Sequence, residues 1–294
     1  MKVFSFRLLC LAATMATGAF SITTSYAQMT VAKVDAVAAL VPPAIKDAGV
    51  LRIAVPDIGK PLAYKEGGSL KGMDVELANA VAQTMGLKAE ISLIPFSAAL
   101  TGLQANKFDI SYGEFYVTAE RLKTADFVSN WQDYSTYLVK KSSGFSPKTL
   151  ADICGHKMGA MAGSAELATL KTASDKCGSN AAAISAFPSI NNAVLALNSG
   201  RVDGVLINRG GAQESIRLDQ GLDASGAIGG GPTATAVARN DNSAQLLEAL
   251  KGAYEHLISS GDYAKILTNN DTAYGAVKTI EVYKEGSTPP TYSF

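Results

Sequence analysis

Short apolar segments alternate with amphipathic segments along most of the chain. Residues 51–55 form an apolar run of strand length, whereas residues 74–85 repeat their apolar positions every three or four residues. The first pattern is typical of a buried strand, and the second of a helix with one buried face. Further strands are expected at 89–94 and 108–112, with a short helix at 97–103 between them. This order predicts a mostly parallel sheet flanked by helices.

The same alternation begins again after residue 145. The predicted elements are a short helix opened by Ser146 and Pro147 and ending near 153, a strand at 157–161, a helix from Ser164 to about 173, a strand at 183–186, a helix capped by Ser189, a strand at 202–207 and a helix from about 211. Proline is favoured in the first turn of a helix, and serine before it. Two sets of elements, each with its own apolar residues, indicate two α/β lobes.

Two extended segments, 134–140 and 233–237, lie between these sets and are expected to form a hinge. The apolar positions of 246–257 then predict a long helix that packs on the first lobe. We therefore expect a discontinuous lobe 1 of residues 28–137 and 236–294, and a lobe 2 of residues 138–235. A hinge of two strands allows two lobes to close on a ligand between them.

The first 27 residues have the pattern of a secretory signal peptide. Lys2 and Arg7 precede an apolar run at 8–20, and small residues follow at 25–27. The run is too short to span a bilayer. We expect a soluble, exported, periplasmic protein whose fold begins near Gln28.

Removal of residues 1–27 takes away two basic side chains and leaves 24 basic and 26 acidic ones. Such a balance argues against steering to nucleic acid or to an anionic membrane. The remaining cysteines, Cys154 and Cys177, are an even pair in an oxidising compartment, which favours a disulfide over two buried thiols. His156 and His256 are the only histidines, and no metal-ligand cluster is expected.

The segment 108–121 holds the strongest candidate for binding chemistry. An apolar strand runs into a turn, after which Thr118 is expected to cap a helix that carries Arg121 in its first turn. A guanidinium binds a carboxylate through two parallel hydrogen bonds, and a helix N-terminus favours an anion. An ordinary surface salt bridge is the alternative for Arg121.

Several motifs occur in order between residue 49 and about residue 267. They are GVLRIAV, LKGMDVELANAVAQTMGLKAE, LTGLQANKFDI, VTAERLKTADFVSNW, LADICGHKMGAMAGSAELATL and ALNSGRVDGVLIN. In this order they resemble the periplasmic solute-binding proteins of ABC importers, in the polar amino acid group (family 3 type). The resemblance implies a two-lobed periplasmic-binding-protein fold and a monomer without cofactor or catalysis. Such a monomer captures a small solute bearing a carboxylate and delivers it to a membrane ABC permease.

The same resemblance implies roles for particular residues. Arg121 corresponds to the residue that clamps the ligand carboxylate, assisted by Thr118 and by the backbone at Gly163, Ser164 and Ala165. Glycine permits close backbone approach, and a helix that begins at Ser164 points N–H groups at an anion. The alternative for Ser164 is a helix cap without ligand contact.

Three positions depart from the family pattern. Asn208 stands where relatives carry an aspartate for the ligand ammonium, and Glu114 and Tyr116 stand where small residues are common. Glu114 is expected either to restore the missing negative charge or to point to solvent. The aromatic that stacks on the ligand is absent near residue 60, so Tyr64 or Trp131 is a candidate substitute.

Two other functions remain open from the sequence. An exported dehydratase-like enzyme would use Glu114 as a general acid. A sensory binding protein would present its ligand to a receptor. Modified amino acids, opines and cyclic zwitterions are candidate ligands beside standard amino acids, because Asn208 lacks the charge that pairs with an ammonium.

Overall fold

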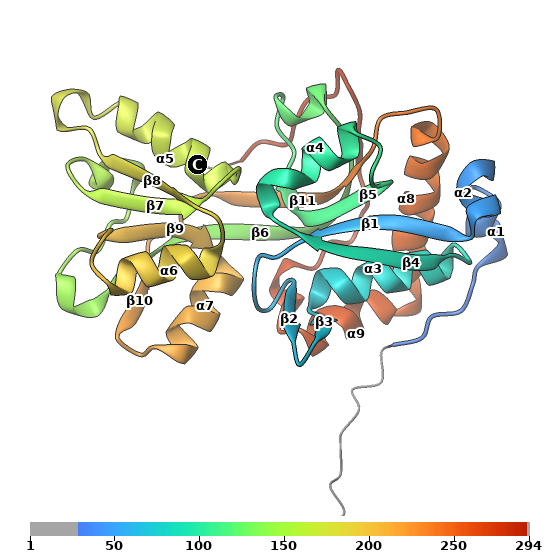
Figure 1. The fold of residues 1–294 in the computed structure, drawn as a ribbon, viewed down its shortest axis with the longest axis horizontal. Helices are drawn as coiled ribbons and strands as arrows, with labels where there is room; N and C mark the ends of the chain where they lie inside the picture. The colour runs from blue at the N-terminus through green and yellow to red at the C-terminus, as the bar shows by residue number, and fades with distance from the viewer. Residues whose placement is uncertain (1–28, 293–294) are drawn as a thin grey trace, which may run out of the picture.

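The computed structural model describes residues 29–292, so the predicted signal peptide lies outside the described residues. The molecule consists of two lobes joined by long strands, as Figure 1 shows. Lobe 1 contains α1 (Asp35–Ala38), α2 (Pro43–Ala48), β1 (Val50–Pro56), β2 (Tyr64–Glu66), β3 (Ser69–Lys71), α3 (Met73–Thr84), β4 (Lys88–Ile94), α4 (Ala99–Gln104), β5 (Ile110–Tyr116), α8 (Ser243–Ser260), α9 (Asp262–Asn269) and β12 (Val282–Tyr283). Lobe 2 contains β7 (Lys157–Met161), α5 (Ala165–Asp175), β8 (Ala183–Phe187), α6 (Ile190–Asn198), β9 (Gly204–Asn208), α7 (Arg209–Leu218) and β10 (Leu222–Ser225).

Strands β6 (Asp126–Lys140) and β11 (Gly230–Val237) connect the lobes. Ten strands form one continuous sheet in the order β4-β1-β5-β11-β6-β9-β7-β8, with β10 and β12 also paired to β6, and β2 and β3 form a separate two-stranded sheet. Pairing is parallel between β1 and its neighbours β4 and β5, and between β7 and its neighbours β8 and β9. The connecting strands pair antiparallel with β5, with each other and with β9. Each lobe therefore has the predicted parallel set, and antiparallel strands join the two sets.

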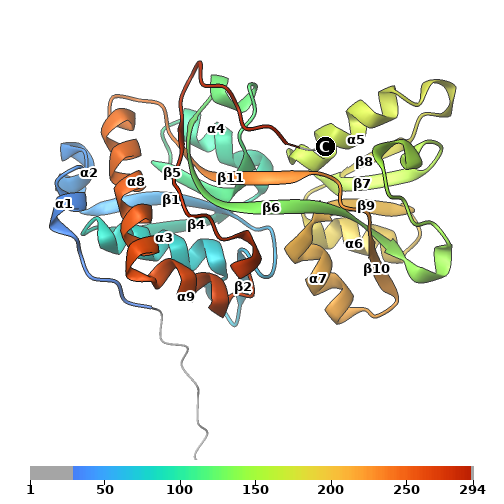
Figure 2. The same cartoon turned by 180° about the vertical axis from the view of Figure 1, so that it is seen from behind.

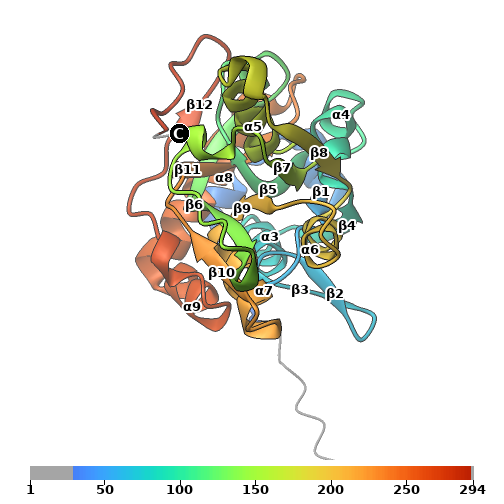
Figure 3. The ribbon, with the colours of Figure 1, turned by 90° about the vertical axis from the view of Figure 1, so that its left-hand side faces the viewer.

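Helices cover both faces of the sheet in each lobe. In lobe 1, α3, α8 and α9 pack together on one face and α4 lies on the other (Figure 1). In lobe 2, α5 lies on one face and α6 and α7 on the opposite one, as Figure 3 shows end-on. Successive residues of β6 serve different cores, since Tyr137 and Val139 pack with α5 whereas Leu138 packs with α6 and α7. This alternation is the two-residue period of a strand.

Several predicted boundaries need correction. Ser97 lies inside a 3₁₀ turn (Phe96–Ala98) that precedes α4, and its side chain caps no helix. The helix expected at Ser146 is instead a 3₁₀ turn (Leu150–Ile153). Thr149 and Asp152 close that turn as a capping box, which satisfies two backbone donors that Ser146 does not reach. The helix expected after Thr118 is a single 3₁₀ turn (Arg121–Lys123).

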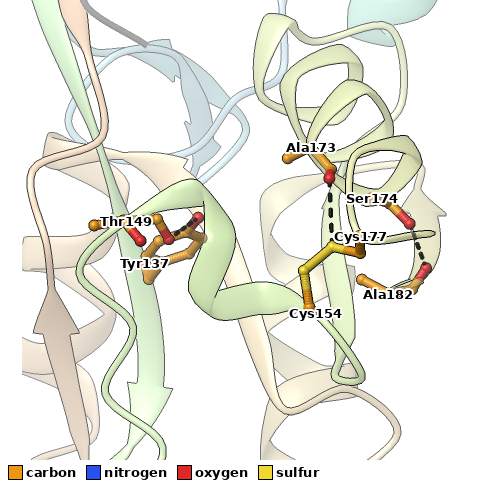
Figure 4. Close-up of a disulfide and its surroundings, with 7 residues drawn as sticks. All are labelled: Tyr137, Thr149, Cys154, Ala173, Ser174, Cys177 and Ala182. Carbon is orange, nitrogen blue, oxygen red and sulfur yellow. Dashed lines mark hydrogen bonds between the residues drawn. A yellow bond between two sulfur atoms is a disulfide. The ribbon is translucent and has the colours of Figure 1, made fainter. Parts of the chain in front are cut away.

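The predicted disulfide is present between Cys154 and Cys177 (Figure 4). It ties the loop after α5 to the turn that precedes β7. Nearby, the Ser174 hydroxyl donates to the carbonyl of Ala182 at 2.9 Å, which holds the end of α5 against the start of β8. Closing a loop of 23 residues is worth about 3 kcal/mol in the chain-entropy account. The bridge braces the outer end of lobe 2.

Residues 29–292 include no helix with both the length and the apolar character needed to cross a membrane. The C-terminal segment has little regular structure after β12, as expected from residue 286 onward. Figure 2 shows it passing the connecting strands and ending beside α5. The exact residues at which lobe 1 and lobe 2 divide stay a prediction.

Candidate functional site

A cavity lies between the lobes where the connecting strands cross from one to the other. It encloses about 550 Å³, including its opening to solvent. Lobe 1 contributes Ile58, Leu62, Phe96, Gly113, Glu114, Tyr116 and Arg121, β6 contributes Asp133, and lobe 2 contributes Met161, Ser164, Ala165, Glu166, Ile190, Ala193, Val205, Leu206, Ile207 and Asn208. A mostly apolar wall with a few charged groups is the usual composition of a small-molecule site.

Arg121 reaches across the cavity from lobe 1 to lobe 2. Its guanidinium donates to the carbonyl of Tyr116 at 2.8 Å and to the carbonyl of Gly163, in lobe 2, at 3.2 Å. The same group lies 5.3 Å from the ring centre of Phe115. Burial lowers the pKa of Arg121, but an arginine stays charged in any protein environment. The side chain is therefore a fixed positive charge on the cavity wall.

The N-terminus of α5 faces the cavity from lobe 2. Ser164 is the predicted N-cap, and its hydroxyl accepts the backbone N–H of Leu167 at 3.1 Å. Gly163 has φ +80°, and a Cβ there would lie 3.2 Å from Cα of Ser97 in lobe 1. Only glycine fits both conditions without strain. The first two residues of α5, Ala165 and Glu166, lie at the cavity wall, where the N–H groups of a helix N-terminus favour an anion.

Glu114 faces the cavity rather than solvent. Its backbone is in the left-handed region at φ 54°, which is uncommon for residues other than glycine. The hydroxyl of Thr233, on β11, donates to Oε2 of Glu114 at 2.5 Å, whereas Oε1 is buried without a hydrogen-bond donor in the part of the chain that the structure describes. Burial first, and then the charge of Asp74, raise the pKa of Glu114. Of the two alternatives from the sequence, the structure has the inward one.

Asp74 lies behind Glu114 at the start of α3. It is fully buried, and neither of its carboxylate oxygens has a hydrogen-bond donor among the described residues. Burial raises the pKa of Asp74 to about 7, although contact with the Glu114 carboxyl opposes part of this shift. Two carboxyl groups in contact away from water titrate together, so this pair holds a proton near neutral pH.

Asp133 is a second cavity carboxylate, which the sequence argument missed. It is 2% exposed, and Oδ1 accepts the backbone N–H of Tyr134 at 2.8 Å. Burial raises the pKa of Asp133, and the negative charges of Glu114 and Glu166 add to the shift. Asn208 lies on the next strand and also lines the cavity. Its side chain hydrogen-bonds to Asp133, which lowers the pKa of that carboxyl, whereas its amide oxygen is buried with no partner among residues 29–292.

Glu166, in the first turn of α5, completes the set of cavity carboxylates. It accepts the hydroxyl of Ser135, on β6, at 2.9 Å. Its negative charge acts on Arg121 and raises the pKa of that guanidinium, which burial lowers. Glu166 therefore belongs to the Arg121 end of the cavity. An acidic residue in a first helical turn reads as helix stabilisation, which is why the sequence did not single it out.

The ring of Tyr116 lines the cavity and packs against the ring of Tyr292 behind it. Tyr116 is 4% exposed, and its ring meets that of Tyr292 edge-on with centres 4.9 Å apart. The hydroxyl of Tyr292 accepts the N–H of Val117 and donates to the carbonyl of Pro232. The C-terminal segment is thus hydrogen-bonded to the residue that follows β5 and to β11.

The candidate aromatics Trp131 and Tyr64 do not line the cavity. Trp131 is fully buried in lobe 1, and its indole donates to the carbonyl of Thr272 at 2.9 Å. Phe96 and Tyr116 supply the aromatic surface instead.

Thr118 also lies outside the cavity wall. Its hydroxyl accepts the backbone N–H of Arg121 at 3.2 Å and so fixes the turn from which Arg121 extends. Within residues 29–292 no group of three or more metal-ligating side chains is placed to hold a metal ion.

The sequence profile of the bacterial extracellular solute-binding proteins, family 3, matches residues 51–270. A probable amino-acid-binding protein of Bacillus subtilis, YxeM, is 34% identical over 119 residues, or 40% of this chain and 45% of that protein. The arginine-binding extracellular protein ArtP of the same organism is 35% identical over 36% of this chain and 41% of its own. The chain thus aligns with less than half the length of these curated relatives.

Solved structures match over most of their length. An ancestral arginine-binding protein bound to arginine is 29% identical with a TM-score of 0.70, over 76% of this chain and 98% of its own. A substrate-binding protein of an amino acid ABC transporter from Streptococcus pneumoniae, bound to L-arginine, is 26% identical with a TM-score of 0.70, over 80% and 100%. An ancestral amino acid-binding protein described as a precursor of cyclohexadienyl dehydratase is 25% identical with a TM-score of 0.68, over 77% and 98%.

Proposed function

The chain belongs to the bacterial extracellular solute-binding proteins, family 3, and from this premise we propose that it captures an amino acid or related small solute with a carboxylate between its lobes. The protein then delivers the solute, unchanged, to a membrane permease of an ABC importer. It works as a periplasmic monomer. Lobe closure orders the site, and the permease distinguishes the closed form from the open one.

The observation that carries this proposal is the pairing of Arg121 with the N-terminus of α5 across the cavity. Arg121 projects from lobe 1, and Ala165 and Glu166, the first two residues of α5, contribute backbone N–H groups from lobe 2. A carboxylate placed between them accepts charge-assisted hydrogen bonds from both lobes at once. Such a ligand stabilises the closed arrangement because neither lobe alone offers all the donors.

The test is ligand binding by the Arg121→Ala variant. Removing one partner of a buried charge pair is expected to weaken binding of a carboxylate ligand by about 2–5 kcal/mol, measured by isothermal titration calorimetry. The matched control is Arg217→Ala, since Arg217 lies on the exposed face of α7 in an ion pair with Glu214. If Arg121→Ala binds within twofold of the parent, the carboxylate clamp is wrong.

The ligand is identified first by a thermal-shift panel. Standard amino acids, N-modified amino acids, opines, dicarboxylates and sugars are added to the protein. A ligand at 100 times its dissociation constant adds about 2.7 kcal/mol to the free energy of unfolding, which raises the melting temperature by several degrees. Shifts with sugars alone would overturn the proposed function.

One observation favours a second candidate, an exported enzyme related to dehydratases. Glu114 lines the cavity with a raised pKa, as a general acid would, and one similar structure is described as a precursor of a dehydratase. Incubation of the protein with each ligand from the panel, followed by mass spectrometry, separates the two functions. A binding protein returns the ligand unchanged, whereas an enzyme releases water and a new product.

A further inference from the structure

The C-terminal segment, residues 281–292, lies beyond the part of the chain that the family profile matches, which ends at residue 270. It begins on lobe 1, where Glu281 and Ser129 exchange two hydrogen bonds and β12 lies antiparallel to the first half of β6. From there it passes the connecting strands, as Figure 2 shows, and brings Tyr292 to the point where β5 ends. A segment outside the family profile thus reaches the cavity wall from behind.

The surrounding residues shape the place that Tyr292 occupies. Its ring meets the ring of Tyr116, which lines the cavity, with centres 4.9 Å apart. Gly231 leaves room for the same ring, because a Cβ on Gly231 would lie 2.9 Å from Cδ1 of Tyr292. The hydroxyl accepts the N–H of Val117 at 2.8 Å and donates to the carbonyl of Pro232 at 2.9 Å. The hydroxyl therefore acts as donor and acceptor within the protein.

This hydroxyl stands in the place of a direct backbone hydrogen bond between β5 and β11. The last antiparallel pair of the two strands is Tyr116 with Thr233, and the next pair in that register is Val117 with Pro232. The Val117 N–H and the Pro232 carbonyl meet on the Tyr292 hydroxyl instead of on each other. Without the hydroxyl both groups need a new partner, since an unpaired buried backbone group is costly.

The peptide group that Tyr292 holds also orients Arg121. The N–H of Val117 and the carbonyl of Tyr116 belong to one planar peptide group, so the direction of one fixes the direction of the other. That carbonyl accepts the Arg121 guanidinium at 2.8 Å. Burial raises the pKa of Tyr292, whereas the Val117 N–H and the nearby charge of Arg121 lower it. The tyrosine hydroxyl, this peptide group and the guanidinium therefore form one chain of contacts.

We propose that Tyr292 is a positioning residue for the ligand carboxylate: it fixes the peptide group between residues 116 and 117, and that group directs the Arg121 guanidinium. The inference rests on the proposed function, because it takes Arg121 as the group that binds the carboxylate. A guanidinium forms two parallel hydrogen bonds with a carboxylate only when the two planes are aligned, so a rotated peptide group weakens binding of an acid. A ligand that lacks the carboxylate is insensitive to this alignment.

The test compares acids with their amides in the Tyr292→Phe variant, which loses the hydroxyl and keeps the ring. The probes are L-glutamine and L-arginine, each titrated by calorimetry beside its α-carboxamide. The parent should prefer the acid. Tyr292→Phe should weaken binding of the acid about 3- to 10-fold, as expected for one lost hydrogen bond, and binding of the amide by less than about twofold. If neither acid binds the parent, the carboxylate with the largest thermal shift and its amide replace them.

The preference for acid over amide separates positioning from a structural role. If Tyr292 only holds the segment in place, its substitution weakens acid and amide alike and leaves the preference unchanged, which would overturn the inference. The matched control is Tyr283→Phe. Tyr283 lies on β12 of the same segment and is partly buried like Tyr292, but its hydroxyl has no hydrogen bond within residues 29–292. This control should change neither the affinity nor the preference.

A measurement without ligand tests the same chain of contacts. In heteronuclear NMR spectra, Tyr292→Phe should shift the backbone amide signal of Val117 and the Nε signal of Arg121, whereas Tyr283→Phe should shift neither. If the Arg121 signal does not move in Tyr292→Phe, the hydroxyl does not orient the guanidinium and the inference is wrong.

These outcomes distinguish the inference from the proposed function. If the parent prefers acids and Tyr292→Phe retains that preference, Tyr292 does not position Arg121 and the proposed function stands. If the parent binds acids and amides equally, or binds no compound with a carboxylate, the carboxylate clamp fails and the positioning role with it. Urea unfolding of each variant verifies that it is folded.

Discussion

Strand β6 carries two buried aspartates in opposite electrostatic settings. Asp126, at its start, pairs with Arg239 at 2.6 Å inside lobe 1. Asp133, seven residues later, has no cation within reach in the described chain and faces the cavity. Both side chains are almost completely removed from water, so exposure does not explain the difference.

The comparison distinguishes a buried carboxylate that stabilises the fold from one that faces the cavity. Asp126 has a permanent cationic partner in Arg239. Arg239 is itself held in place, because it also donates to the carbonyls of Leu122 and Ala125. A buried carboxylate that lacks such a partner raises the free energy of the empty protein. Asp133 is therefore the kind of group whose cost ligand binding can relieve.

The largest effect is expected when the structural pair is broken. Arg239→Ala leaves Asp126 buried without a cation and should lower the free energy of unfolding by about 3–5 kcal/mol. Urea unfolding measures the loss, and the folded variant should bind the ligand found in the thermal-shift panel as tightly as the parent does. A loss below 1 kcal/mol would mean that Asp126 finds another partner and that the two aspartates differ less than their contacts indicate.

A smaller effect is expected from the carboxyl pair behind the cavity. Asp74 has a pKa of about 7 in the folded protein, above the ordinary value of about 3.9 in the unfolded chain. The folded state therefore binds this proton more tightly. The associated stability is complete below about pH 4 and is lost as the pH rises to about 7.

Asp74→Asn tests this pH dependence. The amide is neutral at every pH and has N–H donors for Oε1 of Glu114, so it should raise the free energy of unfolding by roughly 1–3 kcal/mol at pH 8. The gain should be smaller at pH 5, where the parent is already protonated. Urea unfolding at the two pH values decides the matter, and an equal gain at both would refute the raised pKa of Asp74.

The smallest effect is expected at Asp133 itself. Asp133→Asn removes a buried charge but keeps the oxygen that accepts the Tyr134 N–H, so the ligand-free protein should gain about 1 kcal/mol at pH 8. Asp126→Asn should lose stability under the same conditions. If thermal unfolding shows both variants equally destabilised, Asp133 has a structural role like that of Asp126.

The elements were predictable where local chemistry decides them. Ser164 and Ser189 cap α5 and α6 as expected, because a serine hydroxyl before an amphipathic run satisfies the first backbone donors wherever the helix packs. The turn before Arg121 was predicted as a longer helix, yet Arg121 still reaches lobe 2. The long side chain of Arg121 reaches lobe 2 from a single 3₁₀ turn as well as it would from the longer helix that was predicted.

The acidic part of the cavity was only half predictable. The inward direction of Glu114 depends on its left-handed backbone and on Thr233, which lies 119 residues away in the sequence. Asp133 was missed because β6 is buried on both faces over much of its length and lacks the polar and apolar alternation that reveals side-chain direction. Both depend on strand register, which is a property of the whole sheet.

The sharing of β6 between the lobes has a consequence for how the protein denatures. The first half of this strand pairs with β11 and β12, and the second half with β9 and β10. Neither lobe can lose its sheet without removing backbone hydrogen bonds from the other. Two separate hydrophobic cores would ordinarily melt as two domains, but here a common strand makes them one cooperative unit, with a single heat-absorption peak in calorimetry.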